Sequence, residues 1–273
     1  VWAATSKNGH RHYMLKEIQE QPDALLQTLV QDDLVLTEVA LEILRAEKVV
    51  FTACGSSRHA ALIGRLLFAN VARKMPEVVM ASEFGYFERA IDRHTLVIAV
   101  SQSGETADVM EGVRKSKAAG ATIVGVLNRP ACVLADESDM VLRLNCGAEI
   151  GVAATKSFLC QVALFYLLAH AMCNRLQEAK QDLTAAAERL RELLKDLDGE
   201  TERVMRPLVH KRDFYYLGRG VNFALAMEGA LKMKEVSYIH AEGMPAGELK
   251  HGTLALITEG TPVVVLCPND ETY

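Results

Sequence analysis

Short apolar runs alternate with amphipathic segments along most of the chain. Apolar residues at every third or fourth position predict a helix with one buried face, and short β-branched runs predict buried strands. Strands that alternate with helices of about 10–15 residues indicate a parallel sheet with helices on both faces. The pattern predicts strands at 48–53, 78–81, 96–100, 122–127 and 140–144, and helices at 58–74, 107–119 and 155–173.

Helical patterns also lie on either side of this alternating region. Residues 13–30 predict an amphipathic helix with a kink or break at Pro22, and residues 33–47 predict a second, shorter helix. Residues 176–209 are highly charged, with alanine and leucine at helical spacing, and predict a connecting pair of helices.

The alternation begins again near residue 210, with predicted strands at 214–217 and 262–267 around a helix at 224–238. This echo suggests a duplicated domain. Only two strands of the second copy are clear and the chain begins at Val1, so we expect further sequence on both sides. We divide the chain into an N-terminal helical arm, a first α/β domain, a helical connector and a second, incomplete α/β domain: 1–46, 47–175, 176–209 and 210–273.

The composition is that of a globular protein and argues against nucleic-acid binding and membrane association. Half of the residues are apolar and 24% are charged, as in ordinary globular proteins, and a net charge of −5 argues against nucleic-acid binding. The long apolar run 158–173, interrupted by Gln161 and His170, is shorter than the roughly 20 residues that span a bilayer, so we interpret it as a buried helix and expect no membrane association.

The titratable sulfur and imidazole groups are not arranged as a metal site. Six cysteines occur without a C-x-x-C pair, which fits a reducing compartment and a cytoplasmic protein. His10 and His12 have no third ligand nearby in the sequence. We expect neither a metal nor a cofactor.

The strongest candidate for a binding site is the hydroxyl-rich loop Ser101-Gln102-Ser103-Gly104-Glu105-Thr106 between a predicted strand and a predicted helix. Unpaired N–H groups and the helix dipole at such a junction attract anions, and phosphate is the natural ligand. Neither of the common glycine-rich nucleotide-binding motifs is present.

A second junction, Cys54-Gly55-Ser56-Ser57, is read as a small-residue turn between a strand and a helix. Two such loops at the carboxyl ends of neighbouring parallel strands could hold one phosphate from two sides. The alternative is that their Ser and Thr side chains merely cap helices.

Glu228, Lys232 and Glu235 lie at i, i+4 and i+7 and therefore share one helix face. They could form a solvated ion-pair ladder worth a few tenths of a kcal/mol. The glycine-rich stretch 242–252, read as a mobile loop, carries Glu248, Lys250 and His251, and titratable groups on such a connection favour a functional role. Residues 147–156 form a third small-residue loop, suited either to ligand approach or to tight helix packing.

Together these segments resemble one family, the isomerase half of the glutamine–fructose-6-phosphate aminotransferases, also called glucosamine-6-phosphate synthases. The matching segments occur in order along nearly the whole chain: 12–18 with 20–22, 54–57, 101–108, 149–153, 228–232 and 247–252. The resemblance implies an α/β fold with two sugar-isomerase (SIS) domains, each a flavodoxin-like parallel sheet flanked by helices. It also implies a homodimer.

The resemblance further implies residue roles. The residues that would hold the sugar phosphate are Ser56, Ser57, Ser101, Gln102, Ser103 and Thr106. The backbone at Val152 would lie beside the sugar, and Glu228 would bind it too. Glu235 would move a proton between C1 and C2, Lys232 would steady the charged intermediate, and His251 from the partner subunit would assist ring opening.

Two parts of the family pattern are absent from this sequence: the glutaminase domain, expected upstream in the full-length protein, and a C-terminal tail with a lysine that forms a Schiff base. The implied activity is that of the isomerase domain of a glutamine–fructose-6-phosphate transaminase (isomerizing), which converts fructose 6-phosphate and ammonia to glucosamine 6-phosphate. The alternatives are a SIS-type glucosamine-6-phosphate deaminase and a non-catalytic phosphosugar-binding module.

Overall fold

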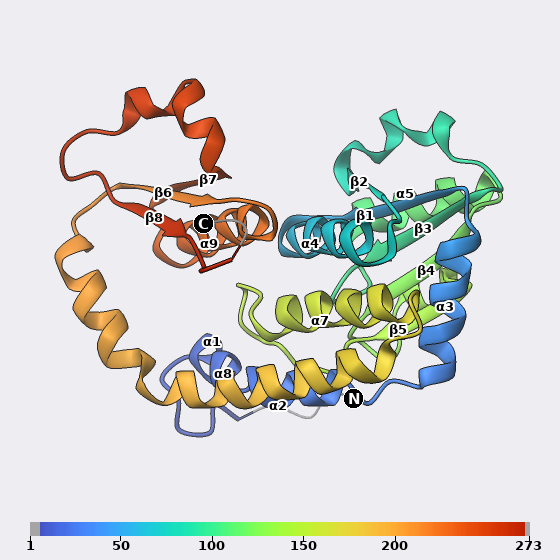
Figure 1. Ribbon diagram of the computed structural model, residues 1–273, viewed down its shortest axis with the longest axis horizontal. Helices are drawn as coiled ribbons and strands as arrows, with labels where there is room; N and C mark the ends of the chain where they lie inside the picture. The colour runs from blue at the N-terminus through green and yellow to red at the C-terminus, as the bar shows by residue number, and fades with distance from the viewer. Residues whose placement is uncertain (1–5, 271–273) are drawn as a thin grey trace. The chain divides into compact units, whose positions relative to one another are not determined.

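The structure is a computed structural model that describes residues 6–270, apart from the side chain of Asp198. The chain divides into two compact units, Val1–Leu190 and Arg191–Tyr273. Each unit contains one parallel sheet with its own helices (Figure 1).

The first unit is built on a five-stranded parallel sheet in the order β2-β1-β3-β4-β5. Its strands are β1 (Lys48–Ala53), β2 (Glu77–Met80), β3 (Thr95–Val100), β4 (Thr122–Leu127) and β5 (Met140–Arg143). This is the flavodoxin-like order, so the predicted fold class is confirmed. The chain moves from β1 outward to β2 and then returns to the other side of β1, so its direction across the sheet reverses between β1 and β3.

Apolar layers cover both faces of this sheet. On one face, Phe51 of β1 packs its ring 5.5 Å from Phe68 and 5.1 Å from Phe165, between ring centroids. That face is covered by α3 (Asp33–Arg45), α4 (Gly55–Ala72) and α7 (Lys156–Ala171). The other is covered by η1 (Ala81–Tyr86), α5 (Ala107–Ala118) and α6 (Val133–Glu137), with η2 (Glu88–Ala90) following η1. Helix α7 is largely buried, as its apolar run predicted.

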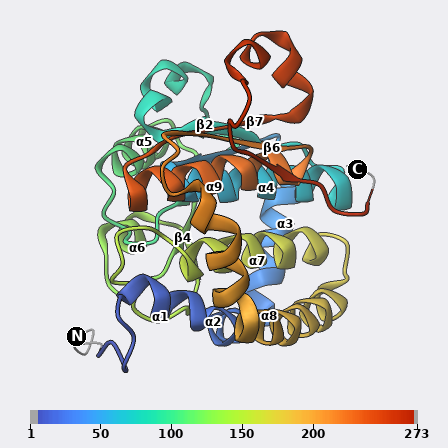
Figure 2. The same ribbon diagram turned by 90° about the vertical axis from the view of Figure 1, so that its left-hand side faces the viewer.

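The N-terminal arm consists of α1 (Tyr13–Gln19) and α2 (Gln21–Thr28). The predicted break at Pro22 was misplaced, since it falls at Glu20 and Pro22 lies in the first turn of α2. Proline is tolerated there because the first N–H groups of a helix have no intrahelical acceptor. Leu25 and Leu26 of α2 pack against α7 and the first half of α8, and Figure 2 shows α2 and α8 running close to α7.

The predicted connecting pair of helices was wrong, because residues 176–205 form one continuous helix, α8 (Leu176–Met205). No proline interrupts this stretch before Pro207, and its single Gly199 does not break it. A short 3-10 turn, η3 (Arg206–Leu208), follows. None of the helices in the described part of the chain is both long and apolar enough to cross a membrane.

The second unit contains β6 (Asp213–Gly218), β7 (His240–Pro245) and β8 (Val263–Leu266), paired in parallel in the order β7-β6-β8. Helix α9 (Val221–Ser237) and the 3-10 turns η4 (Ala246–His251) and η5 (Thr253–Leu256) complete it. This order repeats the β2-β1-β3 arrangement of the first sheet. Strand β7 was not predicted, because its glycine and proline read as loop signals. Its pairing with β6 and its buried Ala241 and Met244 make it a strand.

Candidate functional site

The hydroxyl loop lies at the carboxyl end of β3, and its side chains bond to one another. Ser101 Oγ lies 2.8 Å from Thr106 Oγ1 and accepts a hydrogen bond from the Gly104 N–H at 3.1 Å. Ser103 Oγ accepts from the Glu105 N–H at 3.2 Å. Gly104 has φ +68°, and a Cβ there would collide with Cys132 Sγ. The loop therefore needs glycine at this position and holds a compact ring of hydroxyl groups.

The amino ends of α4 and α5 are not closed by their own preceding side chains. Among the described residues, neither Cys54 before α4 nor Thr106 before α5 makes a capping side-chain hydrogen bond. Helix α4 begins at Gly55, so Ser56 and Ser57 lie in its first turn rather than in the predicted turn before it. The two helix N-termini are suited to an anion, whereas Ser101 and Ser103 already accept hydrogen bonds from N–H groups of their own loop, as the alternative interpretation expects.

Both junctions lie at the ends of β1 and β3, where the direction in which the chain crosses the sheet reverses. Strands β1 and β3 are neighbours, with Thr52 opposite Ala99. Open parallel sheets bind ligands outside the carboxyl ends of the strands at such a reversal. The first unit thus brings its two candidate phosphate loops to adjacent strand ends.

Gln161 of α7, which was not predicted to have a functional role, contacts this region from the sheet face that α4 and α7 cover. Its side chain is 1% exposed, and its Nε2 donates to Ser57 Oγ at 2.9 Å. Its Oε1 has no hydrogen-bond partner among the described residues. A glutamine inside an otherwise apolar run was the available sequence signal.

Asn128, also not predicted, links the hydroxyl loop to the loop at 147–155. Its backbone N–H donates to the Gln102 carbonyl at 3.1 Å. Its side-chain Nδ2 donates to the Gly147 carbonyl at 2.7 Å, and its Oδ1 accepts from the Cys146 N–H at 3.2 Å. This buried amide therefore ties the ends of β3, β4 and β5 together.

The loop at 147–155 connects β5 to α7 and is held by two glutamates. The Glu17 carboxylate accepts hydrogen bonds from the backbone N–H groups of Ile150 and Gly151. Glu149 accepts from the backbone N–H groups of Thr155 and Ser157 at the start of α7. Val152 is 97% exposed between these fixed points.

Two of the candidate catalytic residues, Lys232 and Glu235, lie in the second unit on α9. Lys232 Nζ lies 3.3 Å from Glu228 Oε1 and 2.5 Å from Glu235 Oε2. The Glu228 side chain is 8% exposed, Lys232 18% and Glu235 31%. A ladder of solvated ion pairs would have exposed side chains, whereas Glu228 and Lys232 are largely buried. The three residues therefore form a half-buried cluster, and Glu235 is its most accessible member.

His251 lies at the end of η4 and is exposed. The predicted mobile loop at 242–252 was wrong as a secondary-structure interpretation, since it comprises the end of β7 and the turn η4. Within the described residues, His251 is not brought into the ion-pair cluster of Lys232. Glu248 and Lys250 lie on the same 3-10 turn.

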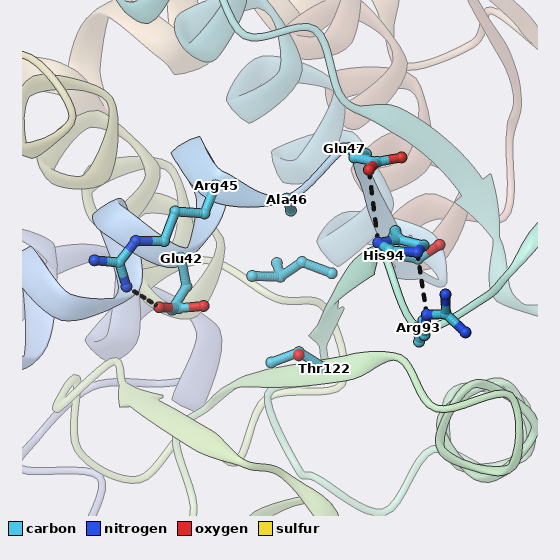
Figure 3. Close-up of a pocket in the computed structure, with 9 residues that line it drawn as sticks. Glu42, Arg45, Ala46, Glu47, Arg93, His94 and Thr122 are labelled. Carbon is cyan, nitrogen blue, oxygen red and sulfur yellow. Dashed lines mark hydrogen bonds and ion pairs between the residues drawn. The ribbon is translucent and has the colours of Figure 1, made fainter.

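A separate pocket of about 200 Å³ lies at the amino ends of the strands of the first sheet, away from the hydroxyl loop (Figure 3). It is lined by residues at the amino ends of β1, β3 and β4, including Glu47, Thr95 and Thr122. His94 lies 3.6 Å from Glu47 there and accepts from Arg93 at 3.2 Å (Figure 3). Its charged groups are paired with each other, which gives no reason to place a ligand there. No group of three or more His, Cys, Asp or Glu side chains within the described residues could hold a metal ion.

The fold and the loops define an α/β protein with two hydroxyl-bearing strand-to-helix junctions at the carboxyl ends of adjacent parallel strands. Residues 42–171 and 208–273 match the model of the SIS domain, and the chain belongs to the SIS domain family.

Individual relatives support a closer placement. The glutamine–fructose-6-phosphate aminotransferase [isomerizing] of Thermococcus kodakarensis is 43% identical over 275 residues, which is 98% of this chain and 46% of that protein. The solved C-terminal domain of glucosamine-fructose-6-phosphate aminotransferase from Francisella tularensis is 37% identical, with a TM-score of 0.85, over 98% of this chain and 79% of that one. The resemblance to the isomerase half of these aminotransferases is confirmed, and the chain spans about half the length of the curated relatives it matches.

A third relative is named for a different activity. The glucosamine-6-phosphate deaminase from Thermotoga maritima is 25% identical, with a TM-score of 0.64, over 93% of this chain and 76% of that structure. The fold is therefore shared by proteins named for amination and for deamination of the same kind of sugar.

Proposed function

We propose that this chain is the sugar-phosphate isomerase domain of an aminotransferase that makes glucosamine 6-phosphate from fructose 6-phosphate and ammonia. The observation that carries the proposal is the Glu228–Lys232–Glu235 cluster, a lysine between a buried and a more exposed carboxylate. Aldose–ketose interconversion needs an accessible base and a nearby cation, and this cluster supplies both.

The steps of the proposed reaction are assigned to three residues of the chain, Glu235, Lys232 and His251. Ammonia replaces the C2 carbonyl oxygen of the open-chain sugar as an imine, and water leaves. Glu235 takes a proton from C1 and returns it at C2, while the C1 hydroxyl gives up its proton and the imine nitrogen gains one, which leaves an aldehyde at C1 and an amine at C2. Lys232 stabilises the anionic charge that develops between these steps, and His251, supplied by the partner subunit of a homodimer, assists ring opening.

The sugar is held by groups remote from the reacting carbons. We assign its phosphate to Ser56, Ser57 and the residues of the hydroxyl loop: Ser101, Gln102, Ser103 and Thr106. The uncapped amino ends of α4 and α5 support this assignment. Val152 and Glu228 contact the sugar itself. Binding at the phosphate supplies orientation for the proton transfer.

The test is proton NMR of the chain with fructose 6-phosphate and ammonium chloride in D₂O. Glucosamine 6-phosphate with deuterium at C2 supports the proposed reaction. Binding of the sugar without product or exchange contradicts the proposal for this chain and favours the phosphosugar-binding module.

The deaminase is the second candidate, because the solved deaminase shares this fold at 25% identity. It predicts release of ammonia from glucosamine 6-phosphate with no measurable synthesis in the forward direction. The same NMR assay, started from glucosamine 6-phosphate, separates the two.

A further inference from the structure

The loop at 147–155 is held by a side chain that is distant in the sequence. Glu17 of α1 is 2% exposed. Its Oε1 accepts from Ile150 N–H at 2.5 Å and from Gly151 N–H at 3.1 Å, and its Oε2 also accepts from Gly151 N–H at 3.1 Å. A buried carboxylate is costly unless it is fully hydrogen-bonded, so this contact fixes the loop backbone strongly.

The carboxylate of Glu17 lies close to Gly151. A Cβ on Gly151 would lie 2.6 Å from Glu17 Oε2, so the carboxylate would have to shift. The glycine therefore lets the backbone amide approach the carboxylate directly. The amides of Ile150 and Gly151 both bond to one carboxylate. A rotation of the loop backbone that keeps one of these hydrogen bonds would therefore break the other.

The same loop is fixed at both of its ends. Asn128 joins Gly147 to the hydroxyl loop through Gln102, and Glu149 bonds the first turn of α7. Lys156, 3% exposed, pairs with Glu20 of the arm at 2.7 Å. Val152 stands 97% exposed in the middle of this frame. Val152 is thus an exposed apolar side chain on a backbone that buried polar contacts hold on both sides. Such an arrangement favours a ligand-binding surface.

We propose that Glu17 is a positioning residue for the sugar-phosphate site, an inference that rests on the proposed function above. Its carboxylate holds the backbone at Ile150 and Gly151, and thereby sets the position of Val152 relative to the hydroxyl loop. The helical arm is thus part of the sugar site. The phosphate-binding hydroxyls do not depend on this contact.

The test compares Glu17→Gln with Thr28→Val in the full chain. Thr28 is a matched control because its buried hydroxyl also joins the arm to the end of β5, at the Leu144 carbonyl, without touching residues 149–152. Hydrogen exchange of peptides covering residues 147–155 reports on the loop. Calorimetric titration with fructose 6-phosphate and with inorganic phosphate reports on binding.

We expect Glu17→Gln to raise amide exchange at residues 150 and 151 about tenfold and to weaken fructose 6-phosphate binding about tenfold, because an amide group can satisfy only part of this contact. Inorganic phosphate should bind within about twofold of the unmodified chain. Thr28→Val should lower the melting temperature without changing either affinity beyond twofold.

Equal fructose 6-phosphate affinity in the unmodified chain and Glu17→Gln overturns the inference and leaves the proposed function standing. An equal loss of affinity in Thr28→Val also overturns it, because the effect would then be one of general arm stability. If the unmodified chain binds inorganic phosphate but not fructose 6-phosphate, the proposed function fails, and the positioning role fails with it.

Discussion

Gln161 buries an amide of which only the nitrogen has a hydrogen-bond partner among residues 6–270. Its Nε2 occupies one acceptor site of the Ser57 hydroxyl. A serine hydroxyl has one proton to donate, so this contact leaves that proton free to point at a phosphate. The unpartnered Oε1 carries a desolvation cost of about 1–3 kcal/mol. Stability and binding therefore oppose one another at this residue.

We predict that Gln161→Met has opposite effects on the two properties. The similar volume preserves packing and removes the unbonded oxygen, so the free energy of unfolding should stay equal or rise by about 1 kcal/mol. Affinity for inorganic phosphate should fall about three- to tenfold because Ser57 is no longer oriented. Urea denaturation and phosphate titration on the same samples measure both, and a variant with unchanged phosphate affinity would argue against the role.

Glu235 is the accessible carboxylate of its cluster, and its substitution tests the proposed base. Glu235→Gln should lower turnover at least about a hundredfold, since it removes the proton acceptor, while fructose 6-phosphate affinity stays within about threefold. The control is Glu259→Gln, at an exposed glutamate of the same unit, and it should change neither turnover nor fructose 6-phosphate affinity. Normal turnover by Glu235→Gln would refute the assignment.

Some of the site could be predicted from single residues and some could not. Ser101, Ser103 and Thr106 were recognisable because their residue types and spacing follow a strand directly. Asn128 and Glu17 were not, because each acts through backbone groups of a loop distant in sequence. Local patterns carry no information about such partners.

At the scale of elements, the arm is held to the rest of the first unit by a partly buried cluster of opposite charges. Glu20 pairs with Lys16 at 3.2 Å and with Lys156 at 2.7 Å. Burial tends to raise the pKa of Glu20, but hydrogen bonds and attraction from these two ammonium groups outweigh it and hold that pKa below 4.5. A carboxylate with a lowered folded pKa stabilises the protein above its unfolded pKa and loses this contribution as the pH falls through the folded one.

We therefore predict that docking of the arm weakens in acid. Glu20→Gln should lose about 1 kcal/mol at neutral pH, a value that allows for the one-third exposure of the Glu20 side chain. The difference from the unmodified chain should shrink below about pH 4.5. Urea unfolding between pH 3 and 7 measures this, and a difference that stayed constant with pH would show that Glu20 acts by packing alone.

Elements were predictable where local and long-range preferences agree. The first sheet follows from β-branched runs between amphipathic helices, and β1 and β4 match their predicted bounds. Strand β7 failed because glycine and proline dominate its local pattern, whereas pairing with β6 decides its conformation. Helix α6 was missed because five residues are too few to show a helical period.

At the scale of the whole molecule, each compact unit has its own apolar core. In the first unit Phe51 packs between α4 and α7, and in the second Phe214 packs against Ala230 and Ala241. Both phenylalanines are nearly or fully buried. Because the cores share no residue, a cavity in one should leave the cooperative opening of the other largely unchanged.

We predict that Phe214→Ala destabilises the second unit by about 3–5 kcal/mol. Native-state hydrogen exchange should rise in β6 and α9 and stay nearly unchanged in β3. Phe51→Ala should show the reverse pattern. Equal loss of protection in both sheets for either variant would mean that the two units unfold as one cooperative body.

Proteins built this way can diverge one unit at a time. The hydroxyl loops belong entirely to the first unit, and the lysine between two carboxylates belongs entirely to the second. On the proposed assignment, substitutions in the second unit can alter or abolish the reaction without touching any residue that holds the phosphate. A lineage with this layout would then keep substrate capture while it acquires a new reaction.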